Sequence, residues 1–356
     1  MSKLLYVGED IARIDCGSDS VNKRNIDILK NIFGDQFILT PLKRGNSVSD
    51  KLKFYIGGLD STIERQVLKL LVSDTSIQFV FISQSLVGRL AKAIKRKVKR
   101  DIVIICFYHN IEKHYAKEFL KTSGLRHYPF YIWASFNESR AVRYSDINIV
   151  LNERDGHVLE SIYQKRYDLI LPAGYRDQFE QSRALTHALE QPIYLFVGTA
   201  FFGNLDGIEW FIENILPNVE GKLIIIGKGM DAYKEKYHHE RLEIYGFMED
   251  LSTYYYNASL VIAPIFSGGG MKTKTAEALM YGKTIVGTKE AFEGYVRDDR
   301  AMIECNKDNF LKTLQRLEKS RIFPLNDYSR GIFVNYYSNE AIESALKDKF
   351  KNIDIK

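Results

Sequence analysis

Cysteine is scarce in this 356-residue sequence, and its distribution excludes a common kind of metal site. Cys16, Cys106 and Cys305 stand alone, form no CxxC pair and have no histidine at a metal-binding spacing. Structural zinc normally needs such clustered Cys and His ligands. The sequence therefore predicts a protein of a reducing compartment that contains no structural zinc.

Long apolar runs are also missing. No stretch approaches the roughly 20 apolar residues that a membrane-spanning helix needs. The apolar part of the N-terminal MSKLLYVGED is too short for a signal peptide. We expect a cytoplasmic protein that is at most peripheral to the inner face of a membrane.

A strong excess of one charge is absent as well. The formal net charge is +5, with 27% of the residues charged and 45% hydrophobic, which are globular values. This small positive excess suits a partner that carries phosphates, but it is too small to indicate a nucleic-acid binder. We therefore expect no nucleic-acid partner.

What the sequence does contain is an alternation of short apolar runs with longer amphipathic ones. This rhythm predicts an α/β fold with parallel sheets and helices on their faces. It starts at the N-terminus and restarts near 193, so we expect two Rossmann-like domains at 1–175 and 190–337. A final amphipathic helix at 338–356 is expected to pack back on the first domain. The expected strands lie at 3–7, 36–39, 77–82, 102–108 and 146–151, and then at 193–197, 222–226, 242–245, 260–264 and 284–287.

A glycine-rich turn lies between an expected strand and helix of the second domain. The strand ends at Pro264, and Gly268, Gly269 and Gly270 follow just before the helix. Glycines let the backbone approach a ligand closely, and a helix start offers unpaired N–H groups and the positive end of the dipole. The turn therefore indicates an anion site.

Charged residues follow this turn at a useful spacing. Lys272 and Lys274 add full positive charges at the helix start, and Glu277 lies one turn further on. A carboxylate can accept hydrogen bonds from two ribose hydroxyls. Together with the turn, these residues predict a site for the diphosphate and ribose of a nucleotide. The alternative is a glycine-rich loop with solvated lysines and a Glu–Lys pair on a helix surface.

The stretch GGGMKTKTAEALMYGKTIVGT, residues 268–288, resembles the donor-binding motif of retaining glycosyltransferases with the GT-B fold, in their large family four. Further segments follow in the order of that family: CFYHNIE at 106–112, the run from Glu138 into INIVLNERD, FVGTAFFGNLDGIEWF at 196–211, IIGKG at 225–229 and YGFMEDL at 245–251. The resemblance covers most of the chain. It implies a GT-B fold, with two Rossmann-like domains whose sheets face a central cleft, and a nucleotide-sugar donor.

The resemblance also implies roles for single residues. Glu277 is implied to hold the ribose, Phe247 to border the base, and His109 to reach the donor sugar from the first domain. The implied donor-binding residues are Gly17, Asn204, Lys228, Phe247, Gly268, Gly269, Gly270, Met271, Lys272, Lys274 and Glu277, and the implied catalytic residues are His109, Lys272 and Glu277.

Two departures from the family pattern stand out. Gly269 occupies the position where many members carry a glutamate, eight residues before the helix glutamate. The loop at 199–206 lacks the Arg and Lys with which many members neutralise the diphosphate. We predict that Lys272 and Lys228 supply this charge instead.

Breaking the bond between sugar and diphosphate leaves negative charge on the departing group, so cationic and N–H donors are needed around it. The sequence has no Asp-x-Asp motif and no convincing ligand cluster for a divalent ion. We therefore expect no metal and no other cofactor. His109 follows an expected strand, where ligands bind in parallel sheets, although a lone histidine there is often structural. Glu112 and His114 are close enough in sequence to orient it or to meet the acceptor.

The basic run from Arg89 to Arg100 predicts an amphipathic helix with a cationic face. Such faces are usually just solvated, and the functional alternative is docking on an anionic membrane. That alternative would suit a lipid-linked acceptor; a glycan or glycoprotein acceptor is equally open.

The resemblance implies that the chain transfers a hexose-type sugar from a nucleotide-sugar donor to an acceptor. Three other functions compete with this hexosyltransferase activity. A nucleotide-sugar epimerase shares the fold but needs acid–base carboxylates around one sugar, which the sequence does not show. A catalytically silent, sugar-nucleotide-binding subunit of a transferase complex stays open because of Gly269. A Rossmann dehydrogenase is disfavoured because no Gly-x-Gly-x-x-Gly follows the first strand of either domain.

Overall fold

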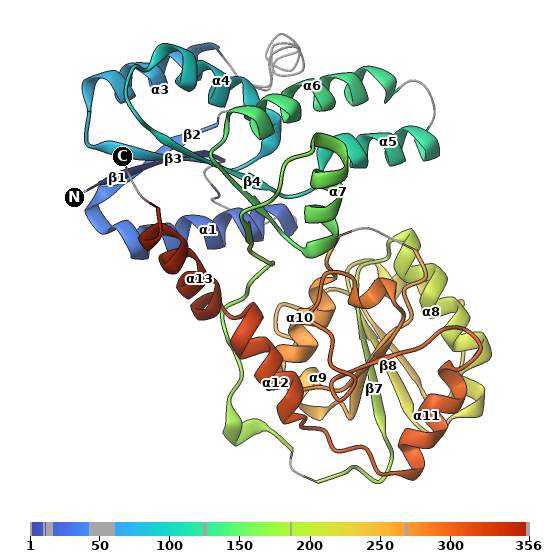
Figure 1. Ribbon diagram of the computed structural model, residues 1–356. Coiled ribbons are helices and arrows are strands. Elements are labelled where there is room, and N and C mark those ends of the chain that lie inside the picture. Colours follow the sequence, from blue (N-terminus) through green and yellow to red (C-terminus); the bar gives the residue numbers. More distant parts are fainter. Residues whose placement is uncertain are drawn as a thin grey trace. The chain divides into compact units, whose positions relative to one another are not determined.

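The computed structural model describes residues 2–9, 11, 17–42, 61–123, 127–185, 187–267 and 270–353. The chain divides into two compact units, Met1–Ala173 with Ile342–Lys356 and Gly174–Ala341 (Figure 1). The sequence placed the start of the second domain at 190. The structure places it at Gly174, because Tyr175 and Tyr337 are joined by a backbone hydrogen bond of 2.9 Å and the Glu180 N–H donates to the Tyr256 hydroxyl at 2.6 Å.

The first unit is built on a parallel sheet with the strand order β2-β1-β3-β4-β5-β6. Its strands are β1 (Lys3–Gly8), β2 (Phe37–Pro41), β3 (Ile77–Ile82), β4 (Val103–Tyr108), β5 (Ile147–Val150) and β6 (Leu169–Ile170). Its helices are α1 (Gly17–Phe33), α3 (Ser61–Ser73), α4 (Gly88–Lys97), α5 (Glu112–Ser123), α6 (Tyr128–Tyr144) and α7 (Glu153–Tyr163), together with the short η1 (Gly34–Gln36) and η2 (Ser85–Val87).

This sheet is covered by apolar side chains on both faces. Successive residues of one strand enter different cores: Tyr6 packs with one cluster, while Leu5 packs with another. A parallel sheet buried on both sides needs strands that are largely apolar, which explains why β4 is an unbroken apolar run and why Gln78 is the one polar residue of β3. The cluster that contains Tyr6 also includes residues of α13 (Asn339–Lys351). The centre of the Phe350 ring in this helix lies 5.0 Å from that of Phe33 and 5.3 Å from that of Phe79.

The second unit is built on a parallel sheet with the order β12-β11-β10-β7-β8-β9. Its strands are β7 (Ile193–Val197), β8 (Lys222–Ile226), β9 (Leu242–Tyr245), β10 (Leu260–Ala263), β11 (Ile285–Gly287) and β12 (Met302–Glu304). Its helices are α8 (Phe202–Asn214), α9 (Ser252–Asn257), α10 (Thr273–Met280), α11 (Phe310–Lys319) and α12 (Asp327–Ile332), with the short η4 (Gln181–Arg183), η5 (Leu216–Asn218), η6 (Met230–Tyr233), η7 (Glu290–Phe292) and η8 (Phe333–Tyr337).

The order of the second sheet is that of a doubly wound nucleotide-binding fold. The chain crosses from β7 to β8 and β9 on one side and returns to β10, β11 and β12 on the other. The direction of winding therefore reverses between β7 and β10. In such sheets, ligands bind outside the carboxyl ends of the two strands at the reversal. The fold thus points to the loops after β7 and β10.

The sequence predicted most of these elements. The strands β7, β8 and β9 have the predicted bounds. The helix α7 begins after Asn152, whose side chain caps it by accepting a hydrogen bond from the Asp155 N–H. The strands β6 and β12 were not predicted. They are only two and three residues long, too short for a periodic signal.

Candidate functional site

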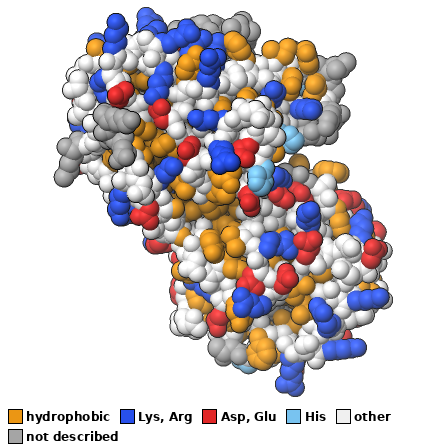
Figure 2. Space-filling view, viewed as in Figure 1, with side chains coloured by type: hydrophobic (Ala, Val, Ile, Leu, Met, Phe, Trp, Pro, Cys, Tyr) orange, Lys and Arg blue, Asp and Glu red, His pale blue; other side chains and the backbone are white. Residues whose placement is uncertain are grey.

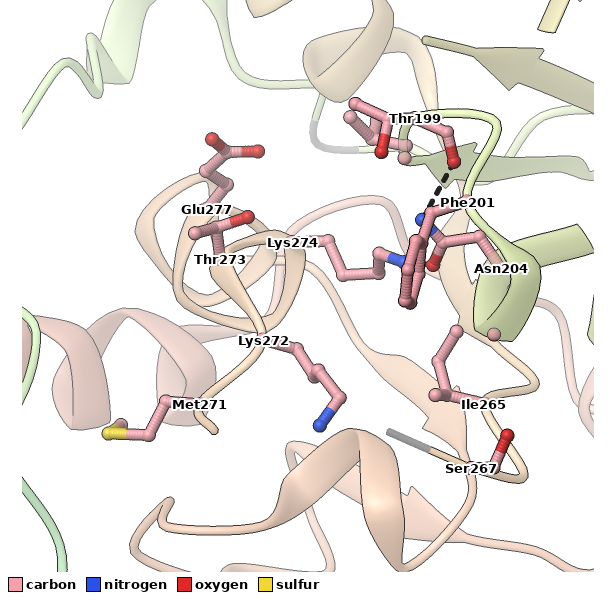
Figure 3. Close-up of a pocket in the computed structure, with 13 residues that line it drawn as sticks. Thr199, Phe201, Asn204, Ile265, Ser267, Met271, Lys272, Thr273, Lys274 and Glu277 are labelled. Atoms are coloured by element: carbon pink, nitrogen blue, oxygen red, sulfur yellow. Dashed lines mark hydrogen bonds between the residues drawn. The ribbon is translucent and has the colours of Figure 1, made fainter. Parts of the chain in front are cut away.

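A pocket of about 360 Å³ opens at the carboxyl ends of β7 and β10, where the winding of the second sheet reverses. Its walls come from the turn after β7, the start of α8, the loop after β10 and the start of α10 (Figure 3). The lining residues are Val197, Gly198, Thr199, Phe201, Gly203, Asn204, Ile265, Ser267, Met271, Lys272, Thr273, Lys274 and Glu277. The pocket therefore contains Asn204, Met271, Lys272, Lys274 and Glu277 of the implied donor-binding set.

Asn204, in the first turn of α8, connects two walls of the pocket. Its amide Nδ2 donates to the Thr199 carbonyl at 2.9 Å, and its Oδ1 accepts from Lys274 Nζ at 2.5 Å (Figure 3). Gly198 leaves the room for this pair, because a Cβ there would lie 2.8 Å from Asn204 Nδ2 and 3.0 Å from Lys274 Nζ. Any larger residue at this position would displace one partner or the other.

Lys274 is a buried amine at this junction. Its side chain is only 6% exposed, and Nζ lies 4.5 Å from the centre of the Phe196 ring. Burial and, to a smaller extent, the nearby charge of Lys272 lower the pKa of Lys274 to about 7, against the opposing effect of Glu277. A charge here is costly in the absence of an anion, so the pocket favours a negatively charged ligand.

Lys272, the N-cap residue of α10, has a different environment. Its Nζ donates to the Glu290 carboxylate at 2.7 Å and to the Gly270 carbonyl at 2.8 Å. The carbonyl of Lys272 accepts a hydrogen bond from the Tyr295 hydroxyl at 2.7 Å, which fixes the backbone at this point. Lys272 therefore lines the pocket while paired with a carboxylate from η7.

Glu277 lies one turn into α10, and in Figure 3 its carboxylate points away from Lys272. The Tyr255 hydroxyl of α9 donates to Glu277 Oε2 at 2.8 Å. Burial raises the pKa of Glu277, while the hydrogen bond from Tyr255 and the charge of Lys274 act in the opposite direction. The Glu277 carboxylate thus lines the pocket and is held in place by the Tyr255 hydroxyl. A group that binds ligand hydroxyls needs to be held in this way.

The glycine-rich turn is described only in part. Gly270 has a φ of +66°, a left-handed conformation that favours glycine, whereas Gly268 and Gly269 lie outside the described residues. The carbonyl of Gly270 faces Lys272, as noted above. The left-handed conformation of Gly270, which other residues rarely adopt, therefore precedes Lys272 where the chain enters the wall of the pocket.

Two implied donor-binding residues lie on neighbouring loops. Lys228 is exposed in the turn after β8, and its carbonyl accepts from the Ala200 N–H at 2.9 Å. Phe247 follows β9, with its side chain 74% exposed. Neither is among the residues that line the pocket, whereas Phe201, which the sequence did not single out, lines it with a ring that is 62% exposed. The sequence signal that could have identified Phe201 is the pair of adjacent phenylalanines, Phe201 and Phe202, in a loop that contains no cation.

His109 lies in the first unit, at the carboxyl end of β4. Its Nε2 lies 3.0 Å from Asn22 Oδ1 of α1, the helix that begins at Gly17. Burial lowers the pKa of His109 to about 4, with a further lowering from the charge of Arg24. The imidazole is therefore neutral at pH 7. It can exchange a hydrogen bond with a hydroxyl but does not carry a proton for general acid catalysis.

A buried carboxylate fixes the segment that follows His109. Glu138 of α6 is fully buried and accepts hydrogen bonds from the N–H groups of Glu112 and Lys113 at 2.6 and 3.1 Å, at the start of α5. It also accepts from the Ser85 and Tyr163 hydroxyls at 3.0 and 2.8 Å. The sequence treated Glu138 only as part of a family segment, because its partners are remote in the chain.

Glu138 also affects its neighbour. Burial and, to a smaller extent, the adjacent charge of Glu138 raise the pKa of Glu112 to about 7.

Among the described residues, no group of three or more His, Cys, Asp and Glu side chains is arranged to hold a metal ion. In the same described ranges, no helix is both long and apolar enough to cross a bilayer.

The fold agrees with solved structures over nearly the whole chain. Sucrose-phosphate synthase from Thermosynechococcus elongatus superposes with a TM-score of 0.67 at 13% identity, covering 98% of each chain. The lipopolysaccharide outer core galactosyltransferase WaaB gives 0.68 at 13% identity, covering 99% of this chain and 100% of the other. HepE from Anabaena, in complex with UDP-glucose, gives 0.64 at 12% identity with the same coverage.

These likenesses show that the chain has the two-domain GT-B fold of glycosyltransferases. Residues 191–319 match the model of the family described as "Glycosyl transferases group 1". The matched residues lie in the second unit, which also contains the whole of the pocket described above. A search of curated protein sequences finds no significant match.

Proposed function

We propose that this chain transfers a hexose-type sugar from a nucleotide-sugar donor to a glycan, lipid-linked or glycoprotein acceptor. The observation that carries the proposal is the pocket at the reversal of the second sheet, with two lysines at the start of α10 and Glu277 one turn behind them. HepE binds UDP and UDP-glucose in its solved complexes, which supports a nucleotide sugar as donor here.

The two lysines fit the chemistry of the leaving group. Departure of the sugar leaves negative charge on the diphosphate, and fixed positive charges around that position stabilise the transition state. Lys272 and Lys274 line the pocket, and the start of α10 adds the positive end of the helix dipole. We infer that these groups act without a metal ion.

Three further residues, of which Glu277 and His109 belong to the implied set, fit the other parts of such a donor. The Glu277 carboxylate, held by Tyr255, can accept hydrogen bonds from the two ribose hydroxyls. The exposed ring of Phe201 offers an apolar surface beside the pocket. His109, neutral at pH 7, suits a hydrogen bond to a sugar hydroxyl. Retention of the anomeric configuration is proposed from the resemblance to family four.

A donor panel tests the proposal. The protein is incubated with UDP-, GDP- and dTDP-sugars, with and without candidate acceptors, and released nucleotide is measured. Acceptor-dependent release is expected. Epimerised sugar would instead identify an epimerase, and binding without turnover would identify a catalytically silent subunit.

A variant connects the activity to the pocket. Lys272→Ala should raise the donor KM or lower turnover by at least tenfold, because the leaving diphosphate loses a fixed cation. Lys289→Ala, an exposed lysine next to Glu290, is the matched control and should leave both unchanged. Unchanged kinetics in Lys272→Ala would contradict the assignment of the site.

The cationic face of α4 supports a further part of the proposal, docking on an anionic membrane. Figure 2 shows Lys and Arg side chains gathered over the part of the first unit that contains α3 and α4. Some of this charge is neutralised, since Arg89 and Lys97 contact Glu64 at 2.8 and 3.1 Å and Lys95 contacts Asp146 at 2.7 Å. The full run from 89 to 100 is therefore not available to a membrane.

Three cations of the run remain for such docking. Arg100 donates to three backbone carbonyls, whereas Lys92, Arg96 and Lys99 form no ion pair with any residue in the described ranges. Each exposed cation near an anionic surface contributes about 1 kcal/mol. The triple change of Lys92, Arg96 and Lys99 to Gln should abolish flotation with anionic vesicles.

The control for this flotation experiment removes the same charge elsewhere. Changing Lys307, Lys312 and Lys319 of the second unit to Gln should leave flotation unaltered. Equal flotation of the native protein with anionic and neutral vesicles would rule out docking.

A further inference from the structure

The cations around the pocket are not equivalent. The loop at 199–206 carries none, and the Lys272 amine is already paired with the Glu290 carboxylate at 2.7 Å. Lys274 Nζ donates to Asn204 Oδ1 and lies over the ring of Phe196, and both of these groups are neutral. Within the described part of the chain, Lys274 is the one of the two lining lysines whose amine contacts no carboxylate.

The surroundings of Lys274 explain how an amine can stay there without a counter-ion. Its side chain is 6% exposed, and the full charges that act on it come from α10 itself, Lys272 at the N-cap and Glu277 one turn on. The Glu277 carboxylate accepts a hydrogen bond from Tyr255, and the Glu290 carboxylate accepts one from Lys272. The ring of Phe196, from β7, and the Asn204 amide, from α8, complete the surroundings.

We propose that Lys274 is the principal cation for the donor's diphosphate, and that its amine takes up one proton from solvent when the donor binds and releases it when the nucleoside diphosphate leaves. The inference rests on the proposed function, because it assumes a diphosphate in this pocket. An anion beside a buried amine supplies the favourable charge that burial has removed. The free pocket therefore favours the uncharged amine, and the occupied pocket favours the ammonium ion.

The pH dependence supports this coupling and has a definite sign. The pKa of Lys274 in the free pocket is about 7, and a bound diphosphate raises it. Below pH 7 the amine is already charged in the free protein, so Lys274 adds no pH dependence to the donor affinity there. Above pH 7 each binding event must recruit a proton, so the affinity falls about tenfold per pH unit until the pKa of the complex is reached.

Calorimetry with the full chain measures the proton directly. UDP-glucose, GDP-mannose and dTDP-glucose are titrated at pH 8 in two buffers of different ionisation enthalpy, and the difference in heat gives the protons taken up per site. Diphosphate diesters carry no group that titrates between pH 7 and 8, so an uptake must come from the protein. About one proton per site is expected at pH 8, falling towards zero at pH 5.5.

Two variants assign the proton to Lys274. Lys274→Arg keeps a cation that is charged at every accessible pH, so it should still bind while taking up no proton. Lys274→Met, of similar length, should weaken binding at pH 7 at least tenfold. Lys236→Met, which removes an exposed amine paired with Glu209, is the control and should retain both affinity and proton uptake.

The outcomes separate this inference from the proposed function. Tight donor binding with no proton uptake at pH 8, or an uptake that persists in Lys274→Arg, would overturn the role of Lys274 and leave the glycosyltransferase proposal intact. A failure of all three nucleotide sugars to bind the native protein would overturn both.

Discussion

Lys272 Nζ lies 2.7 Å from Glu290 Oε1, and the two side chains are only 13% and 24% exposed. The pair joins the start of α10 to η7, and it lies at the wall of the pocket. Lys272 therefore interacts with a protein carboxylate before any donor arrives. A diphosphate that binds Lys272 competes with Glu290 for the same amine.

This competition predicts the effect of removing the carboxylate charge. Glu290→Gln should tighten the binding of UDP-sugar or of its GDP or dTDP counterpart by about two- to fivefold, since a partly exposed ion pair contributes up to about 1 kcal/mol. Calorimetric Kd values at low and high salt measure the effect. Glu304→Gln, which removes a carboxylate paired with Arg297, serves as the control. Weaker binding in Glu290→Gln would mean that Glu290 holds Lys272 in place rather than competing for it.

Tyr255 sets the protonation of the carboxylate proposed to bind ribose. Its hydroxyl donates to Glu277 at 2.8 Å and lowers a pKa that burial raises. Tyr255→Phe removes that hydrogen bond, so the pKa of Glu277 should rise further. Protonation removes one of the acceptors needed for two ribose hydroxyls. As the pH falls, the Tyr255→Phe variant should therefore lose donor binding at a higher pH than the native protein does.

The measurement for Tyr255→Phe is the donor Kd between pH 5 and pH 8. A several-fold weaker Kd at pH 6 with a nearly native value at pH 8 is expected. The control is Tyr245→Phe, which removes a hydroxyl that donates to Glu243. A uniform loss at every pH would show that Tyr255 acts through packing alone.

His109 predicts a pH dependence of stability. Its pKa in the folded protein is about 4, against 6.5 for an ordinary histidine, because burial opposes the charged form. Between these two values the unfolded chain binds a proton that the folded chain does not. The stability contribution is therefore present above pH 6.5 and is lost as the pH falls towards 4. His109→Gln should reduce the loss of Tm between pH 7.5 and pH 5.

The comparison variant for His109 is His114→Gln, since His114 is exposed on α5. It should keep the native change in Tm over the same pH interval. Identical pH profiles for His109→Gln and the native protein would show that His109 titrates normally.

Glu138 predicts a large structural effect in the first unit. Four donors, from η2, α5 and α7, converge on its carboxylate, and replacing it by Ala would leave buried donors unsatisfied. Each such group costs about 1–3 kcal/mol. Glu138→Ala should therefore lower the free energy of unfolding by several kcal/mol in urea denaturation, whereas Glu138→Gln, which retains acceptor oxygen, should cost less. Equal effects of the two changes would indicate that shape, rather than hydrogen bonding, matters at this position.

The sequence carried enough information for the architecture. Buried parallel strands are largely continuous apolar runs, so IYLFV and KLIII marked β7 and β8 by composition alone. The edge strand β9, LEIY, was predicted with the same bounds although it contains Glu243. The motif at 268–288 likewise indicated an anion site, because glycines, lysines and a helix start are neighbours along the chain. Local signals of this kind require no knowledge of contacts between distant residues.

The tertiary structure decided which residues act together. Asn204 and Lys274 are 70 positions apart, and they meet only because the crossover in the second sheet places β7 beside β10. Glu138 finds its donors in the same way, on segments that begin 53 and 26 residues earlier. Burial, which sets the ionisation of Lys274 and His109, is a property of the packed molecule. The sequence therefore determined the kind of ligand that the pocket suits, whereas long-range packing decided the charge that each side chain presents to it.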